Sequence, residues 1–196
     1  MRNHRVDLSD KLTHLIHADN DYEAIEALYR IACVGHLEGT TKGVLGNTPV
    51  VCFSEAPECE FMKEKKHFKP FGISIEKTYL FSAGGRPVIY QPKEEHALID
   101  SKLHWKIVTY NPIDSVINSW VDWSWQREWR VKTDRLWLPV EKTTFLVPSE
   151  VDREILLARL NDNSMHNAQL EALYLGMLYP HPCDFPYRIE VINTNN

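Results

Sequence analysis

The chain has 196 residues, of which 43% are hydrophobic and 25% are charged, so it is long enough to fold as one domain around a substantial core. Its formal net charge of −5 argues against bulk electrostatic binding to nucleic acid, although a local basic groove is compatible with it. The N-terminus has no apolar run behind its charges, and no window approaches the roughly 18 apolar residues that a membrane helix needs. We therefore expect a cytoplasmic protein without a membrane partner, folded as a single domain over residues 1–196.

The first half of the chain predicts short strands interleaved with few helices. An apolar run with histidines at positions 14 and 17 is typical of a strand, and the Asp-Asn-Asp sequence at 19–21 offers a helix N-cap. The expected elements are a strand over Leu12–His17, a helix over Tyr22–Cys33, a strand over Pro49–Ser54, a helix over Glu55–Met62, and strands over Phe71–Glu76 and Arg86–Tyr90.

The second half predicts three further strands and two helices. Trp105–Tyr110 fits either a strand or a helix. The other expected elements are strands over Glu128–Lys132, Phe145–Val147 and Tyr187–Ile192, and helices over Glu150–Leu160, capped by Ser149, and Asn167–Leu178. Because the order shows no regular βαβ rhythm and no glycine-rich phosphate loop, we expect an α+β fold with a mixed sheet.

Four of the six tryptophans lie between Trp120 and Trp129, close to the acidic residue Glu128. These side chains cannot all share one face of a strand, so the segment is predicted to be a loop that turns into a strand at Glu128. A carboxylate among tryptophans is partly desolvated, which is one way that proteins make an acid reactive. The alternative is a core patch with one surface salt bridge.

Four short motifs occur in a fixed order: Thr13-His14-Leu-Ile-His17, Cys52-Phe-Ser54-Glu, Gly84-Gly-Arg-Pro-Val-Ile-Tyr90 and Arg127-Glu-Trp-Arg130. Together they resemble the ADP-ribosyltransferase superfamily, and more narrowly the DarT-like and AbiGi-like toxins and phage-defence proteins of bacteria. The resemblance covers about residues 11–135 and implies a split mixed β-sheet with flanking helices. Gln126 stands where many bacterial toxins of this superfamily carry a second glutamate, in the position that helps to choose the acceptor.

The resemblance implies a site that takes NAD+ as the ADP-ribose donor. Glu128 falls on the catalytic glutamate, which would hold the ribose and stabilise an oxocarbenium-like transition state. His14 would hydrogen-bond the ribose on the adenosine side, Ser54 would line the nicotinamide pocket, and Arg86 would pair with the pyrophosphate. The residues expected to bind NAD+ are His14, His17, Asn20, Ser54, Arg86, Tyr90 and Trp125.

An aromatic ring, from Tyr90 or Trp125, would stack on nicotinamide, and the tryptophans beside Glu128 would exclude water and favour transfer over hydrolysis. The implied function is an NAD-dependent mono-ADP-ribosyltransferase, a toxin or antiphage effector that modifies DNA or RNA and has an antitoxin protein as a possible partner. Two alternatives stay open: a protein acceptor, and a catalytically idle module that binds NAD+ or a partner.

Each candidate residue also has a purely structural interpretation. A histidine near a strand end is commonly a satisfied core residue, Ser54 fits the N-cap of a helix that begins at Glu55, and Arg86 fits an ion pair across the sheet. A thiol nucleophile at Cys52 is disfavoured, because a buried strand is a poor site for a thiolate. The four cysteines show no ligand spacing, so no metal is expected, and the basic residues at 63–69 fit either a nucleic-acid groove or a solvated turn.

Overall fold

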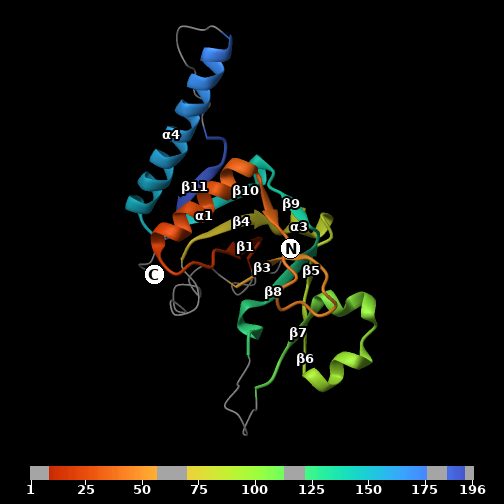
Figure 1. Ribbon diagram of the computed structural model, residues 1–196. Coiled ribbons are helices and arrows are strands. Elements are labelled where there is room, and N and C mark those ends of the chain that lie inside the picture. Colours follow the sequence, from red (N-terminus) through yellow and green to blue (C-terminus); the bar gives the residue numbers. More distant parts are fainter. Residues whose placement is uncertain (1–8, 57–69, 113–121, 176–184, 193–196) are drawn as a thin grey trace, which may run out of the picture.

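The computed structural model describes residues 9–56, 70–112, 122–175 and 185–192, and its centre is a seven-stranded sheet with the order β11-β10-β4-β1-β3-β8-β5 (Figure 1). Neighbouring strands in it are antiparallel, except β10 and β11, which are parallel. The strands are β1 (Lys11–Leu15), β3 (Val50–Ser54), β4 (Gly72–Glu76), β5 (Arg86–Pro87), β8 (Glu128–Lys132), β10 (Thr143–Val147) and β11 (Arg188–Val191). The prediction of an α+β fold with a mixed sheet is therefore confirmed.

Two small sheets flank the large one. In them β2 (His36–Glu38) pairs with β9 (Arg135–Trp137), and β6 (Ile89–Gln91) pairs with β7 (Ile107–Thr109). The helices are α1 (Asp21–Val34), α3 (Lys77–Ser82) and α4 (Glu150–Leu175), with 3₁₀ turns η1 (Lys93–Leu98), η2 (Ser101–Lys106), η3 (Ser124–Gln126) and η4 (Val140–Lys142). Within the described ranges, none of the helices has both the length and the apolar character that crossing a membrane requires.

Helix α1 begins and ends at residues with clear capping roles. The side-chain oxygen of Asn20 accepts a hydrogen bond of 2.9 Å from the backbone N–H of Glu23, so it satisfies one of the free donors of the first turn. At the other end, Gly35 adopts a left-handed conformation with φ of 69°, and its N–H donates to the carbonyl of Ile31. The predicted helix is confirmed with one extra residue at each end.

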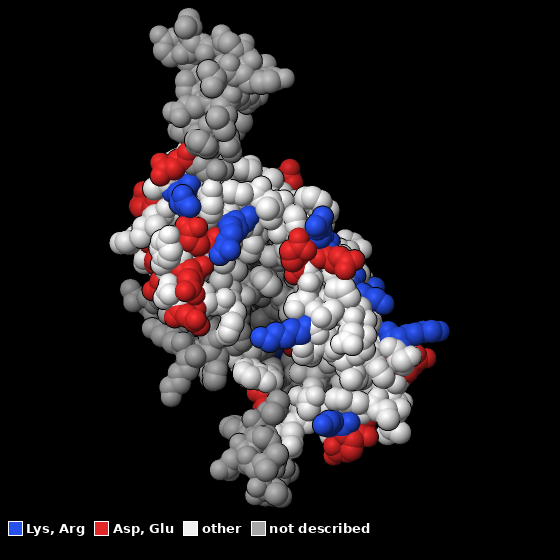
Figure 2. Space-filling model, in the orientation of Figure 1, with Lys and Arg blue, Asp and Glu red and all other residues white. Residues whose placement is uncertain are grey.

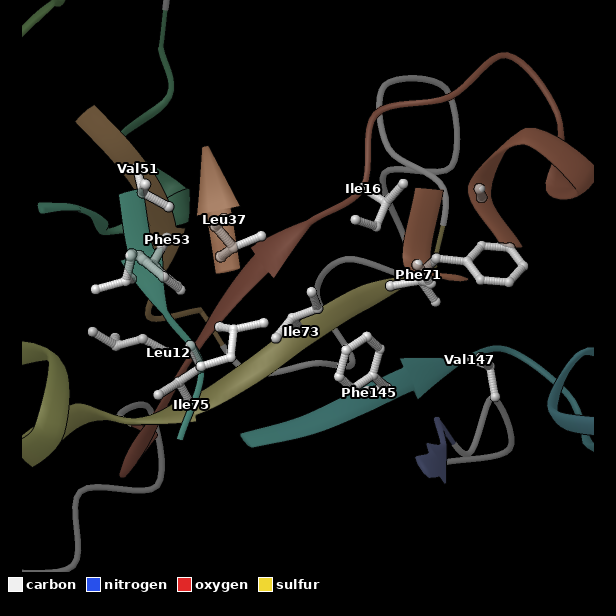
Figure 3. Packing of buried hydrophobic residues seen from close by; sticks show 14 of the residues in the cluster. Leu12, Ile16, Leu37, Val51, Phe53, Phe71, Ile73, Ile75, Phe145 and Val147 are labelled. Atoms are coloured by element: carbon white, nitrogen blue, oxygen red, sulfur yellow. The ribbon is translucent and has the colours of Figure 1, made fainter. Parts of the chain in front are cut away.

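The main core lies between one face of the large sheet and helices α1 and α4, which Figure 1 shows on the same side of the sheet. Leu12, Ile73 and Phe145, from three adjacent strands, are fully buried on that face (Figure 3). Ala24, Ile25 and Leu28 of α1 and Leu156 and Leu160 of α4 belong to the same cluster. Each large apolar side chain buried in this way contributes about 1.5–3 kcal/mol to folding, so the core holds the strands in register.

The opposite face of the sheet carries small polar residues instead. Ser54, Thr13, Ser74 and Thr144 are directly opposite one another across β3, β1, β4 and β10, and all four are buried. Because side chains alternate along a strand, Cys52 and Glu128 project from this same polar face. The fold therefore places its candidate acid on the face that does not form the main core.

Thr143 offers a direct test of how well the core is packed. Its hydroxyl is buried and has no hydrogen-bond partner in the described structure. We expect Thr143→Val to raise the free energy of unfolding by about 1 kcal/mol, because valine has the same shape and removes the unsatisfied hydroxyl. Urea unfolding measures the change, and Thr144→Val, on the other face of the same strand, is the matched control. Equal changes in the two variants would contradict the expectation.

Two predicted elements differ from the structure. The predicted helix Glu150–Leu160 and residues 167–175 of the second predicted helix belong to one helix, α4, because the polar residues between them each cost only a few tenths of a kcal/mol and no glycine or proline interrupts the chain. Residues 176–178 of the second prediction lie outside the described residues. The single strand predicted over Arg86–Tyr90 is divided: β5 pairs with β8, whereas β6 leaves to pair with β7. Val88 lies at the break, where its N–H donates to the carbonyl of Glu128.

Two further expectations concern the segment Trp105–Tyr110 and the chain after β3. The ambiguous segment Trp105–Tyr110 is the end of η2 followed by strand β7. Residues 55 and 56 are not helical, and the rest of the helix predicted over Glu55–Met62 lies outside the described residues, as do the basic residues at 63–69.

Candidate active site

A split in the large sheet forms the candidate site. Strand β1 pairs with β4 along five residues, but with β3 only at Thr13 and Ser54. Beyond that pair the two strands diverge, and a cavity of about 170 Å³ opens between them. His14, Ser54 and Glu128 all line this cavity, which we call the split cavity. Three residues that the sequence associates with NAD+ chemistry are thus brought together from β1, β3 and β8.

His14 bridges the split. Its Nδ1–H donates a hydrogen bond of 2.8 Å to the backbone carbonyl of Cys52, which can only accept. Burial lowers the pKa of His14, and this hydrogen bond opposes that effect. The ring is therefore neutral at physiological pH, and its Nε2 carries a lone pair that can accept a hydrogen bond. The site thus has an acceptor for a hydroxyl group at the position where the two half-sheets separate.

The lowered pKa of His14 predicts a pH dependence of stability. As the pH falls below about 6.5, the unfolded chain binds a proton at this residue while the buried ring resists it, so the folded state loses stability. We expect the difference in free energy of unfolding between wild type and His14→Gln to shrink from pH 7.5 to pH 5.5. The slope is at most about 1.4 kcal/mol per pH unit. Urea titrations at both pH values measure it, and a difference that stays constant would contradict the prediction.

Glu128 is held by a buried arginine on the same strand. The Nε of Arg130 lies 2.7 Å from Oε1 of Glu128, and the two side chains are 7% and 12% exposed. The Nη1 of Arg130 also donates to the carbonyls of Trp105 and Ile107, at 3.0 and 3.1 Å. Because the guanidinium is fixed at three points, it fixes the carboxylate in turn.

Tyr90 secures the backbone of Glu128. Its hydroxyl accepts a hydrogen bond of 2.9 Å from the N–H of Glu128 and donates one of 3.2 Å to the carbonyl of Trp123. Burial raises the pKa of Tyr90 to about 12, so the hydroxyl keeps its proton. The observed contacts of this hydroxyl position the chain around Glu128, and the predicted stacking on nicotinamide stays a prediction.

The turn before Glu128 is fixed by the end of β3. Ser54 Oγ–H donates to the carbonyl of Gln126 at 2.5 Å, and the N–H of Glu55 donates to the carbonyls of Gln126 and Arg127. Arg127 has a left-handed backbone, with φ of 47°, which is rare for a residue with a side chain. Ser54 is therefore both a wall of the split cavity and a positioning residue for the turn.

The buried carboxylate of Glu55 supports the same region from the opposite face of the sheet. It accepts a hydrogen bond of 3.0 Å from Nε1 of Trp129 and pairs with Lys77, whose ammonium also lies 5.4 Å from the centre of the Trp129 ring. Trp129 is therefore a packing residue of the sheet. For this residue the structure agrees with the alternative that the tryptophan segment is a core patch. Trp123 and Trp125 are half-buried and precede the turn.

The other predicted NAD-binding residues do not line the split cavity. His17 is exposed beyond the end of β1, and Asn20 caps α1. Arg86, on the edge strand β5, donates from Nη1 to the carbonyls of Phe81 and Gly85, and its guanidinium lies 4.1 Å from the centre of the Phe81 ring. Trp125 lies in η3, close in sequence to Glu128. Their roles in binding NAD+ stay predictions.

The thiol of Cys52 is not an activated nucleophile. Burial, followed by the nearby carboxylate of Glu128, raises the pKa of Cys52 to about 12. The thiol is protonated at neutral pH, so it has no thiolate to attack a substrate. This agrees with the low weight that the sequence gives to a cysteine mechanism.

Two larger cavities adjoin the split cavity. One, of about 640 Å³, lies against α1, β2 and β9 and shares His14 with the split cavity; Arg30 and Arg135 also line it. The other, of about 660 Å³, shares Gln126 and Glu128 and is also lined by Arg130 and Trp123.

The sequence missed Arg130 as a partner of Glu128, although residues two apart on one strand project from the same face and could have indicated the pair.

No protein-family model matches the sequence, and no curated protein matches it. Among solved structures, the chain is similar to Thermus sp. 2.9 DarT in complex with NAD+, with 12% sequence identity and a TM-score of 0.45 over 95% of this chain and 96% of that chain.

Proposed function

We propose that the protein is an NAD-dependent mono-ADP-ribosyltransferase, a cytoplasmic toxin or antiphage effector that modifies a nucleic acid. The observation that carries the proposal is the placement of Glu128: a carboxylate fixed by Arg130, facing a cavity that His14 and Ser54 also line. These are the residues that the sequence motifs associate with the first, second and catalytic strands of the superfamily.

The cavities fit a dinucleotide donor. The split cavity and the 640 Å³ cavity both have His14 in their walls, and the larger one is also lined by apolar residues of α1, by Arg30 of the same helix and by Arg135 of β9. That combination suits an aromatic base together with phosphates. The neutral His14 offers Nε2 to a ribose hydroxyl between the two cavities.

When bound, NAD+ supplies an ADP-ribosyl group whose bond to nicotinamide breaks through an oxocarbenium-like transition state. Glu128 places negative charge where that positive charge develops, and Arg130 keeps the carboxylate in one orientation. The same carboxylate takes the proton from the attacking group of the acceptor. Ser54 and Tyr90 hold the turn so that Glu128 does not move away from the cavity.

Transfer of radiolabel from NAD+ tests the proposal. Wild-type protein and Glu128→Gln are incubated with NAD+ labelled in its adenylate phosphate, together with DNA, RNA and protein from a bacterial lysate. We expect wild type alone to label a nucleic-acid pool. Label in protein alone would replace the acceptor with a protein, and intact NAD+ in every reaction would leave the idle binding module as the better account.

The effect of expression on growth gives an independent result. An active toxin should slow the growth of bacteria that express wild type, whereas Glu128→Gln should be tolerated. A neutralising antitoxin protein is part of the proposal, and a partner that binds the chain should restore growth with wild type. Equal growth with the two forms, in the absence of any such partner, would contradict the assignment as a toxin.

A further inference from the structure

A groove between α1 and α4 leaves apolar side chains in contact with solvent. Its volume is about 470 Å³, and its apolar walls are formed by Tyr22, Ile25, Ile155 and Ala158. Tyr22 and Ile155 are 71% and 47% exposed. None of the lining residues lines the split cavity or either of the two cavities beside it. The groove, which we call the helix groove, is therefore separate from the candidate active site.

Helix α4 carries two apolar stripes, of which one is buried and one is exposed. Leu156 and Leu160 belong to the main core. Val151, Ile155 and Ala158 recur at intervals of four and three residues, so they share a different face of the helix, and all three are exposed. An exposed apolar stripe among polar residues is typical of a surface that binds another protein.

An ion pair between the two helices fixes the shape of the helix groove. The Nε of Arg159 lies 2.9 Å from Oε1 of Glu26, and its guanidinium lies 4.7 Å from the centre of the Tyr29 ring. Because these contacts join α4 to α1, the groove is formed before a partner binds. From Val151 to Asp162 the exposed face rises by about 16 Å, which is the length of about three turns of a partner helix. Such a helix would insert side chains at the spacing i, i+4 and i+7.

The rim of the helix groove is acidic. Glu154 and Asp162 are exposed and form no ion pair with any residue of the described ranges, and Arg153 and Arg159 of the same helix are each already paired with a glutamate. Figure 2 shows acidic side chains gathered on the side of the molecule where Figure 1 places α1 and the start of α4. Two copies of an acidic surface repel each other, and an anionic membrane is repelled as well. The charge therefore favours a basic protein partner.

We propose that the helix groove is a docking site for a cationic amphipathic helix of a partner protein. The apolar face of that helix rests on the exposed stripe of α4 and on Tyr22, and its lysine or arginine side chains lie beside Glu154 and Asp162. The inference does not depend on the proposed transferase function, because the groove shares no lining residue with the cavities of the candidate site. A partner bound in the groove does not occupy those cavities.

The anisotropy of fluorescent synthetic peptides tests the site. The probe is a helix-forming peptide of about 14 residues with leucine on one face and lysine on the other. A second peptide has glutamate in place of lysine, and a third has the composition of the probe in scrambled order. Two protein variants alter the groove at exposed positions: Val151→Ser with Ile155→Ser removes the apolar stripe, and Glu154→Lys with Asp162→Lys reverses the charge of the rim.

Two further double variants are the matched controls. Leu98→Ser with Leu103→Ser removes exposed leucines, and Glu94→Lys with Glu95→Lys reverses exposed acids; all four residues lie in η1 and η2 and do not line the helix groove. We expect each groove variant to weaken binding of the lysine peptide more than about tenfold, and each control to stay within about twofold of wild type.

The other peptides and the salt dependence check the chemistry of the partner. Wild type should bind the glutamate and scrambled peptides at least about tenfold more weakly than the probe. Raising NaCl from about 50 to about 200 mM should weaken binding of the probe to wild type, and this dependence should be lost in the variant with the reversed rim.

Four results would overturn the docking site. They are a probe that fails to bind wild type, a probe that binds both groove variants as it binds wild type, a scrambled peptide that binds as well as the probe, and a wild-type dimer that becomes a monomer when the apolar stripe is removed. The third result would reduce the site to an acidic surface. The fourth, measured by light scattering, would make the groove an interface between two copies of the chain.

Discussion

Replacing Glu128 with glutamine should lower the rate of ADP-ribosyl transfer by a factor on the order of 100 to 1,000 or more. The amide keeps the size of the side chain and can still accept a hydrogen bond from Arg130, but it brings no negative charge to the developing cation and accepts no proton from the acceptor. Initial rates of label transfer at saturating NAD+ measure the loss.

Glu26→Gln is a matched control for this substitution. Glu26 is also paired with an arginine, Arg159, but it lies on α1 with its side chain 20% exposed and lines none of the three cavities around the site. This variant should fold normally and should not lower transfer by the same factor. Comparable losses in the two variants would mean that Glu128 acts through stability and not through chemistry.

Removing the partner of Glu128 should have the second largest effect. Arg130→Met leaves a carboxylate that is 12% exposed without its cation, and it leaves the carbonyls of Trp105 and Ile107 without their donor. Because an uncompensated buried charge is costly, we expect a loss of about 3 kcal/mol in the free energy of unfolding. Transfer should fall as well, since the carboxylate is no longer held in one orientation.

The double variant Glu128→Gln with Arg130→Met separates the pair from its surroundings. The double variant removes both charges. Its free energy of unfolding should therefore fall by less than the sum of the two single losses, and the difference is a coupling of about 1–3 kcal/mol. Thermal or urea unfolding of the four proteins completes this double-mutant cycle. Additive losses would mean that Arg130 stabilises the fold through the carbonyls alone.

The elements that sequence could predict are those with strong periodicity or clear caps. Helix α1 follows from its apolar spacing and from Asn20, and β3, β4, β8 and β10 follow from apolar or alternating runs. The three-residue strands β2, β9, β6 and β7 were harder, because so short a segment carries no readable period and forms only where a partner strand lies beside it. The continuous course of α4 was missed because the polar residues near its middle each cost a helix only a few tenths of a kcal/mol and therefore do not end it.

The candidate site was predictable to a similar extent. From the order of the motifs we expected His14, Ser54 and Glu128 to belong to one site. In the structure all three line the split cavity. The sequence could not predict the 660 Å³ cavity. Lys93, Thr109 and Trp123, which line it, are distant in the chain and meet only because β6 leaves the large sheet to pair with β7. The double use of Ser54, as a wall and as an anchor for the turn, also requires the tertiary contact with Gln126.

The most direct test of the central claim is the release of nicotinamide from NAD+, followed in wild type and in Glu128→Gln with a single-stranded nucleic acid present. The account predicts that wild type releases nicotinamide in step with the label that it transfers, and that Glu128→Gln releases it at least about 100 times more slowly. Release at an equal rate by both forms would show that Glu128 takes no part in the cleavage of NAD+. Intact NAD+ with wild type would contradict the assignment of a transferase to this chain.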